Sequence, residues 1–180
     1  MTRRALLRWW PAVALAGVFA LGWAVGRGGT RLDDRLLAVD GPEWLLRVTD
    51  TRVLIAALAV ACGVALSRRR WRLAAVVAIC PLVGIAAAQG LKRLFGRELE
   101  GALAYPSGHI TALVVTVGMV VLVTGVDGWL LALAAVVIAA GMYAVGTTYH
   151  YFTDTVGAVL LGTAIVAVGA RVADPPRRSS

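Results

Sequence analysis

The sequence predicts an all-α protein, a bundle of six transmembrane helices with one amphipathic helix at the outer face of the membrane. Three observations support this: 59% of the 180 residues are hydrophobic, only 16% are charged, and mean hydropathy is +0.79. A soluble domain carries about 25% charged residues and could not bury so much apolar surface. Because six spans of about 20 residues with short loops fill the chain, we expect a single membrane domain over residues 1–180.

The expected spans are apolar runs bounded by charged or turn-forming residues. The first follows a basic stub like that of a signal peptide, but no clear cleavage site follows it, so we expect it to remain as a span. The chain between the first two spans, residues 27–50, interleaves leucines with charges and predicts the amphipathic interfacial helix. In order, the spans are 9–26, 52–67, 73–91, 110–126, 129–146 and 155–173.

The basic residues predict orientation rather than nucleic-acid binding. Net charge is +8, but the cations flank apolar segments, where they set membrane topology. With six spans both termini share one side, and that side carries ten of the 18 Lys and Arg against two acids, while the other side carries eight of each. The positive-inside rule then places the termini in the cytoplasm. The Arg-, Ala- and Val-rich composition suggests a bacterial inner membrane.

Three polar clusters lie at the expected outer ends of the spans, at residues 92–97, 105–109 and 150–154. Ionisable groups that end a span and point into a bundle are candidates for function. The two cysteines, Cys62 and Cys80, instead fall inside apolar runs, where packing is the default role. We therefore expect the chemistry of this chain in the three clusters.

His150 and Asp154 form the first candidate pair. A spacing of four places both on one face of a helix, and a carboxylate on one ring nitrogen leaves the other nitrogen free to attack or bind. The alternative is structural: Asp154 caps the last span, assisted by Thr153.

The second candidate is the run Pro106-Ser107-Gly108-His109. Proline favours an extended entry, Ser107 suits an N-cap for the helix starting near Ile110, and the free amides of a helix N-terminus attract anions. His109 would lie at that end. The alternative is a simple turn with a solvated histidine.

Lys92 and Arg97 form the third candidate. A lysine point charge and a bidentate arginine suit a phosphate in an outer pocket. The alternative is that both side chains anchor the protein by snorkelling to lipid headgroups.

The order and spacing of these clusters resemble the type-2 phosphatidic acid phosphatase superfamily, which includes vanadium-dependent haloperoxidases. Its motifs are Lys-x6-Arg-Pro, Pro-Ser-Gly-His and Ser-Arg-x5-His-x3-Asp. The second is intact at residues 106–109, the third keeps His150-x3-Asp154, and the first keeps Lys92. The resemblance covers residues 92–162 and agrees with the six spans of the family's membrane members.

The sequence departs from the family at both arginine positions. Seven residues after Lys92 the family has Arg-Pro, where this chain has Leu99 and Glu100, and Arg97 stands two positions earlier. The Ser-Arg of the third motif is replaced by Tyr143 and Ala144. Arg97 is the candidate substitute for the first arginine. Four candidates for the second stay open: Arg93, Thr147, Thr148 and Tyr149.

The resemblance implies a metal-independent hydrolase that acts on a membrane lipid phosphate and needs no cofactor. It implies that His150 is the nucleophile and becomes phosphohistidine, that Asp154 holds its ring, and that His109 is the general acid and base. The implied phosphate-binding residues are Lys92, Arg97, Ser107 and Gly108.

Two other functions are weighed against this one. The missing arginines favour a non-catalytic phospholipid-binding or transport protein that reuses the fold. His109, His150 and Asp154 also form an acceptable ligand set for a metal ion, although the nearby cations Lys92 and Arg97 would repel one.

Overall fold

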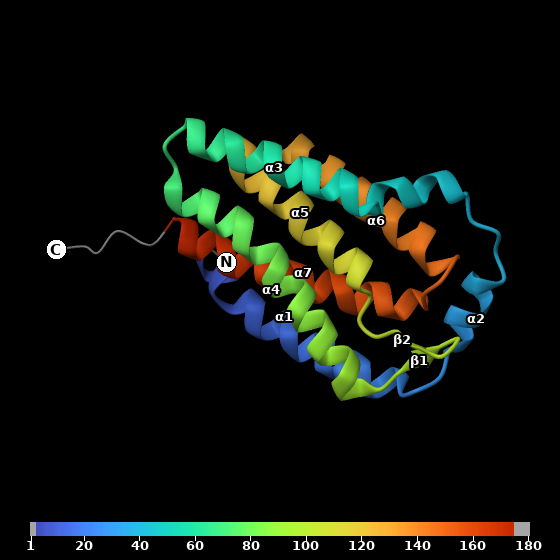
Figure 1. Cartoon of the computed structure of the whole chain (residues 1–180). Coiled ribbons are helices and arrows are strands. Elements are labelled where there is room, and N and C mark those ends of the chain that lie inside the picture. The colour runs from blue at the N-terminus through green and yellow to red at the C-terminus, as the bar shows by residue number, and fades with distance from the viewer. Residues whose placement is uncertain (1–2, 175–180) are drawn as a thin grey trace.

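The computed structural model describes residues 3–174, which form a bundle of long helices with a small cap of irregular structure at one end (Figure 1). Its elements, in chain order, are α1 (Arg3–Val25), α2 (Arg31–Leu37), the 3-10 helix η1 (Glu43–Thr49), α3 (Thr51–Ser67), α4 (Trp71–Phe95), β1 (Glu98–Leu99), β2 (Ala102–Leu103), α5 (Gly108–Thr124), α6 (Gly128–Gly146) and α7 (Phe152–Ala173).

The all-helical prediction is confirmed, and each expected span coincides with a long helix. Within the described residues, five helical segments are long and apolar enough to cross a membrane: 8–25, 43–67, 71–95, 128–146 and 152–173. The remaining expected span, 110–126, is the fourth in order and corresponds to α5, which is apolar but has only 17 residues. At 1.5 Å per residue it is about 26 Å long, slightly short of a hydrocarbon core of about 30 Å.

Helix α5 lies at the centre of the bundle and contributes to two of its apolar clusters. Val115, Met119 and Val123 pack with α3 and α4, whereas Ile110 and Leu113 pack toward α6 and η1. Helices α5 and α7 approach closely because residue 162 of α7 is a glycine. A Cβ at Gly162 would lie 2.6 Å from Val114 Cγ1 of α5. Small residues that let helix backbones approach are typical of packing within membranes.

Many large apolar side chains point outward from this core. Trp23, Ile55, Leu82 and Val136 are each more than half exposed. A water-soluble monomer rarely exposes such an area of contiguous apolar surface. The outer surface is therefore suited to contact with lipid.

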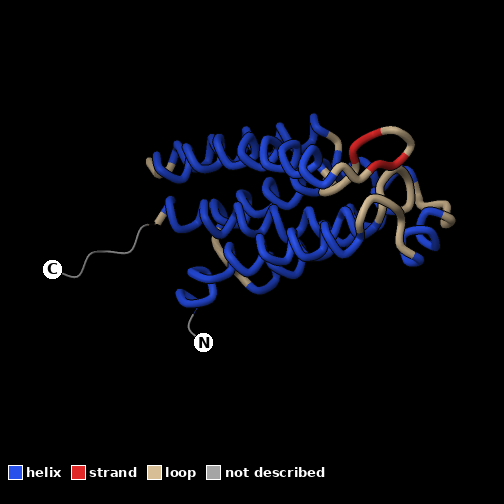
Figure 2. Tube along the Cα trace, turned by 90° about the horizontal axis from the view of Figure 1, so that it is seen from below, coloured by secondary structure: helices blue, strands red, loops and turns tan. Residues whose placement is uncertain are grey.

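The two ends of the bundle differ in structure. The start of α1, the end of α7 and the α3–α4 turn with Arg68 and Arg70 lie at one end, and α2, η1 and the β1–β2 hairpin lie at the other (Figures 1 and 2). The hairpin connection is Glu100-Gly101, both with positive φ (50° and 79°), as a two-residue type I′ turn requires. We call the two ends the terminal end and the hairpin end.

Residues 27–50 differ from the single amphipathic helix that the sequence predicts. They form two short helices, α2 and η1, with Gly41 and Pro42 between them. Proline lacks the N–H that a continuing helix would need. Helix α2 is also drawn into the protein, because Asp33 is fully buried.

The close α5–α7 contact gives a test of the packing. Replacing Gly162 with alanine places a methyl against Val114 and the Thr111 carbonyl, and we expect a loss of about 1–3 kcal/mol through overpacking. Gly63→Ala on α3 is the matched control, since its Cβ meets no atom within 4 Å. Thermal unfolding in detergent should show a lower Tm for Gly162→Ala alone. Equal Tm values for the two variants would contradict this packing.

Candidate functional site

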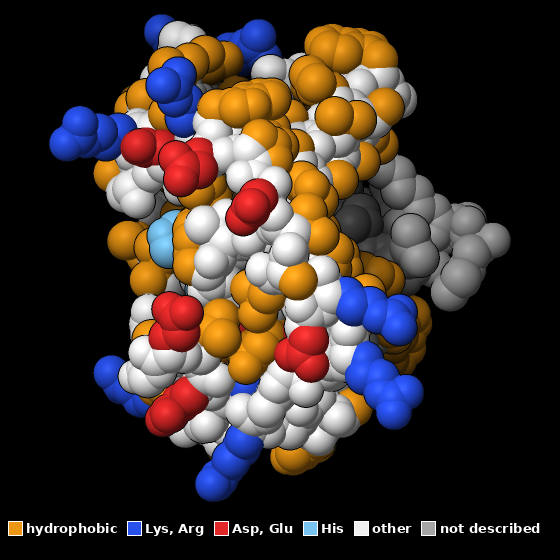
Figure 3. Space-filling view, turned by 90° about the vertical axis from the view of Figure 1, so that its right-hand side faces the viewer, with side chains coloured by type: hydrophobic (Ala, Val, Ile, Leu, Met, Phe, Trp, Pro, Cys, Tyr) orange, Lys and Arg blue, Asp and Glu red, His pale blue; other side chains and the backbone are white. Residues whose placement is uncertain are grey.

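The second and third sequence clusters meet at the hairpin end of the bundle. The backbone N–H of Ser107, just before α5, donates to the Asp154 carbonyl in the first turn of α7 at 3.1 Å. This contact brings His109 and His150 together, with ring centroids 6.4 Å apart. His150 is 7% exposed, whereas His109 is exposed. Figure 3 looks onto this end and shows a histidine side chain at the surface, with acidic and basic side chains around it.

His150 faces Asp154, as the spacing of four predicts. The two residues are not on one helix, however: His150 lies in the loop before α7, and Asp154 lies in its first turn. Helix α7 begins at Phe152, with Tyr151 as N-cap, so His150 precedes the helix. Its Nδ1 lies 3.4 Å from Asp154 Oδ2, which leaves Nε2 free of the carboxylate. The capping alternative is wrong, because Asp154 lies inside the first turn of α7, after the N-cap Tyr151, and its side-chain oxygens contact His150 and Arg97.

Arg97 is the centre of the polar structure at this end. It is fully buried, and its five N–H groups all have protein acceptors. Nη1 donates to Asp154 Oδ1 and Thr153 Oγ1, each at 2.7 Å. Nη2 donates to Asp33 Oδ2 at 2.8 Å and to the Gly28 carbonyl at 2.9 Å, which also accepts from Nε at 3.1 Å.

This placement differs from the predicted phosphate-binding role of Arg97. With every N–H engaged and no exposed surface, the guanidinium has no donor to offer a phosphate, nor does it snorkel to lipid headgroups. Its plane also lies over the Tyr151 ring, with Cζ 4.3 Å from the ring centroid. Arg97 instead holds Asp154 in place behind His150.

Asp33 is the partner of Arg97 that sequence reasoning missed. It accepts from the Thr30 N–H and Oγ1 and from the Thr153 N–H and Oγ1, each at 2.9 Å. Burial alone would raise the pKa of Asp33, but these donors outweigh it and hold the pKa below its ordinary value. Thr30-x-x-Asp33 forms a capping box at the start of α2, the one sequence signal that pointed to it.

Lys92 lies in the last turn of α4, which ends at Gly96 in the left-handed conformation (φ 58°). Its ammonium donates to the Leu103 carbonyl at 2.7 Å, which leaves two of its three donors. Its charge acts electrostatically on His109 and on Asp154. Lys92 therefore belongs to the same cluster as the histidines.

Ser107 and Gly108 differ in what they offer a ligand. The Ser107 side chain is fully buried and accepts from the Ile110 N–H at 3.5 Å as the predicted N-cap, and its own N–H is used by Asp154. Gly108 is the first residue of α5, and a Cβ placed there would meet open space. Of the two predicted amides, that of Gly108 is the one that can face an anion.

The residues that could replace the missing arginine of the third motif differ in whether their hydroxyls are already used. The Thr147 and Thr148 hydroxyls both donate to carbonyls of α6, including that of Ala144. Tyr149 instead packs against both histidines, with centroid distances of 5.3 Å to His109 and 5.7 Å to His150. Burial raises the pKa of Tyr149, so its hydroxyl is a neutral donor at physiological pH.

The comparisons with known proteins give no match: no family model, no curated protein and no solved structure matches this chain. Within residues 3–174, no three His, Cys, Asp or Glu side chains are grouped so that they could hold a metal ion. The same part of the chain has no buried side-chain nitrogen or oxygen without a hydrogen-bond partner. The arrangement of this site alone must therefore support any function assigned to it.

The Asp33–Arg97 pair gives a prediction with a defined pH dependence. Asp33→Asn removes the negative charge that pairs with Arg97, and we expect a loss of about 1.5–3 kcal/mol at neutral pH. Because the folded-state pKa of Asp33 lies below 3.8, this stabilisation is complete above that value and is lost as pH falls through the folded-state pKa.

Unfolding of the full chain in detergent at neutral and acidic pH measures this difference. The difference in the free energy of unfolding between wild type and Asp33→Asn should become smaller below pH 3.8. The matched control is Asp34→Asn, since Asp34 neighbours Asp33 on α2 but is exposed. A gap independent of pH, or an equal loss in the control, would contradict the assigned contact.

Proposed function

We propose that this protein is a multi-pass membrane enzyme that hydrolyses the phosphate ester of a membrane lipid through a phosphohistidine intermediate. The observation that carries the proposal is the convergence of His109 and His150, 6.4 Å apart, with Asp154 on Nδ1 of His150. A nucleophilic imidazole oriented by a carboxylate, with a second imidazole nearby to donate a proton to the leaving group, is the arrangement that this kind of nucleophilic displacement needs.

In the first step Nε2 of His150 attacks phosphorus. The N–P bond forms as the bond from phosphorus to the lipid oxygen breaks, and His109 gives that oxygen a proton. Asp154 stabilises the imidazolium character that develops on His150. In the second step His109 takes a proton from water, the water oxygen attacks phosphorus, and the N–P bond breaks to release phosphate and restore His150.

The oxygens that carry the developing charge would be stabilised by few groups. Lys92 supplies the positive charge, and the Gly108 amide supplies a donor at the N-terminus of α5, where the helix dipole favours an anion. The ring of Tyr149 packs against both histidines, and its hydroxyl would add a neutral donor. In this proposal Arg97 acts as a positioning residue through Asp154 rather than on the phosphate itself.

The substrate class follows from the membrane character of the chain. An acyl or prenyl chain can remain in the bilayer while its phosphate reaches the hairpin end. Candidate substrates are a polyprenyl phosphate or diphosphate, a lipid-linked sugar phosphate, and phosphatidate. We place the hairpin end at the outer face of a bacterial inner membrane, with both termini in the cytoplasm, on the charge distribution of the loops.

The central test is phosphate release from these lipid phosphates in the presence of EDTA. The purified wild type should release phosphate and form a covalent phosphoprotein. His150→Ala should lose both activities, because the attacking nitrogen is gone. Arg70→Gln at the terminal end should retain them. The proposal is wrong if folded wild-type protein releases no phosphate from any of these substrates.

Gly108 gives a second test, which separates ligand binding from folding. A methyl at this position meets no protein atom, so Gly108→Ala should not lower the Tm. If the phosphate approaches the α5 N-terminus, the methyl displaces it and kcat/KM should fall about 10–100-fold. Gly90→Ala, also facing open space on α4, should leave kcat/KM unchanged. Wild-type kinetics in Gly108→Ala would place the phosphate elsewhere.

A second candidate function is supported by the engagement of Arg97. Because all five of its N–H groups are used internally, the site binds phosphate with less positive charge than the family motifs imply. This favours a non-catalytic phospholipid-binding or transport protein. Such a protein would bind a lipid phosphate equally well in wild type and His150→Ala and turn it over in neither.

A further inference from the structure

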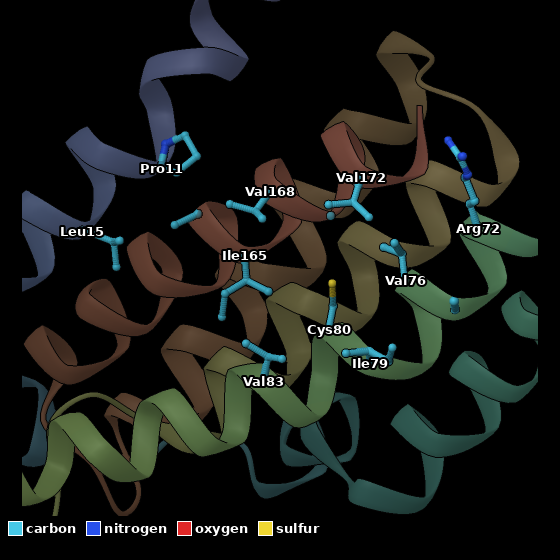
Figure 4. Close-up of a pocket in the computed structure, with 13 residues that line it drawn as sticks. Pro11, Leu15, Arg72, Val76, Ile79, Cys80, Val83, Ile165, Val168 and Val172 are labelled. Carbon is cyan, nitrogen blue, oxygen red and sulfur yellow. The ribbon is translucent and has the colours of Figure 1, made fainter. Parts of the chain in front are cut away.

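A groove opens between α1 and α4 in the half of the bundle nearer the terminal end. Its volume is about 670 Å³, and α7 forms its floor. Figure 4 shows the side chains along it, with Arg72 at one end. Residues from all three helices line it, among them Pro11, Leu15, Arg72, Cys80, Ile165 and Val172.

The groove arises because α1 and α4 meet only toward the hairpin end. There Phe95 of α4 packs against Phe19 and Trp23 of α1, with centroid distances of 5.9 and 6.2 Å. Toward the terminal end the two helices diverge on either side of α7 (Figure 4). The result is a groove between the two helices that widens toward Arg72.

The length of the groove fits a lipid chain. From Arg72 to Val83 the groove follows α4 over twelve residues, about 16 Å, which matches the hydrocarbon depth of one leaflet at about 15 Å.

The charge at the open end indicates the kind of lipid. Arg72 is the one charged side chain among the lining residues, and none of the three ion pairs found in residues 3–174 involves it. An arginine at the membrane boundary, with its stem along apolar surface, attracts an anionic headgroup.

We propose that this groove binds one anionic glycerophospholipid of the leaflet at the terminal end, with its acyl chains along α7 and its phosphate at Arg72. The site is separate from the histidine cluster, which lies at the opposite end of the bundle. The lipid would fill the gap between α1 and α4 and fix the position of α1. The inference does not depend on the proposed phosphatase activity.

The test uses the full-length protein in nanodiscs of equal parts phosphatidylcholine and phosphatidylglycerol, followed by native mass spectrometry. Wild type should retain one lipid, enriched in phosphatidylglycerol. Arg72→Gln should lower that enrichment about fivefold, the effect of one arginine near an anionic lipid. Arg70→Gln is the matched control, because Arg70 lies two residues away and does not line the groove.

A second pair of variants tests the groove itself. Ala75 lines it, whereas Ala78 is exposed on α4 and does not. Ala75→Phe should abolish lipid retention, and Ala78→Phe should not. The proposal fails if wild type retains both lipids equally, if Ala75→Phe keeps its lipid, or if wild type is a dimer that Ala75→Phe converts to a monomer, since a second chain would then fill the groove.

Discussion

The buried guanidinium of Arg97 is the interaction on which the hairpin end depends. A charge removed from water is tolerated only when it is paired and fully hydrogen-bonded. Asp33 and Asp154 supply the pairing, and Thr153 and the Gly28 carbonyl complete it. These acceptors come from the α1–α2 loop, α2 and α7, so one side chain joins segments that are distant in sequence. Removing Arg97 would leave two buried carboxylates facing each other.

This network has a direct consequence for His150. Asp154 presents one oxygen to Arg97 and the other to the His150 ring, and its backbone carbonyl accepts from Ser107. These contacts fix the position of the Asp154 carboxylate. The carboxylate in turn restricts the orientation of the His150 ring. The α2 segment, which contacts neither histidine in these interactions, contributes to the site through Asp33 and Arg97.

Sequence reasoning succeeded where the signal is local. The long helices follow from apolar runs, and the His150–Asp154 pair follows from a spacing of four, although a loop and not a helix brings them together. It missed the role of Arg97, because its partner Asp33 lies 64 residues earlier and only packing joins them. The division of residues 27–50 into α2 and η1 was in principle visible at Pro42, whereas the burial of Asp33 was not.

The use of Arg97 inside the protein changes how a lipid phosphate would be held. One lysine and a helix N-terminus attract a phosphate less strongly than several arginines would, so under the proposed function ground-state binding of the headgroup would be weak. A lipid substrate would compensate because its chains already lie in the bilayer, which would confine the phosphate near the site without charge on the protein. Interactions with the phosphate can then be concentrated on the developing charge of the transition state, where they raise the rate rather than only the affinity.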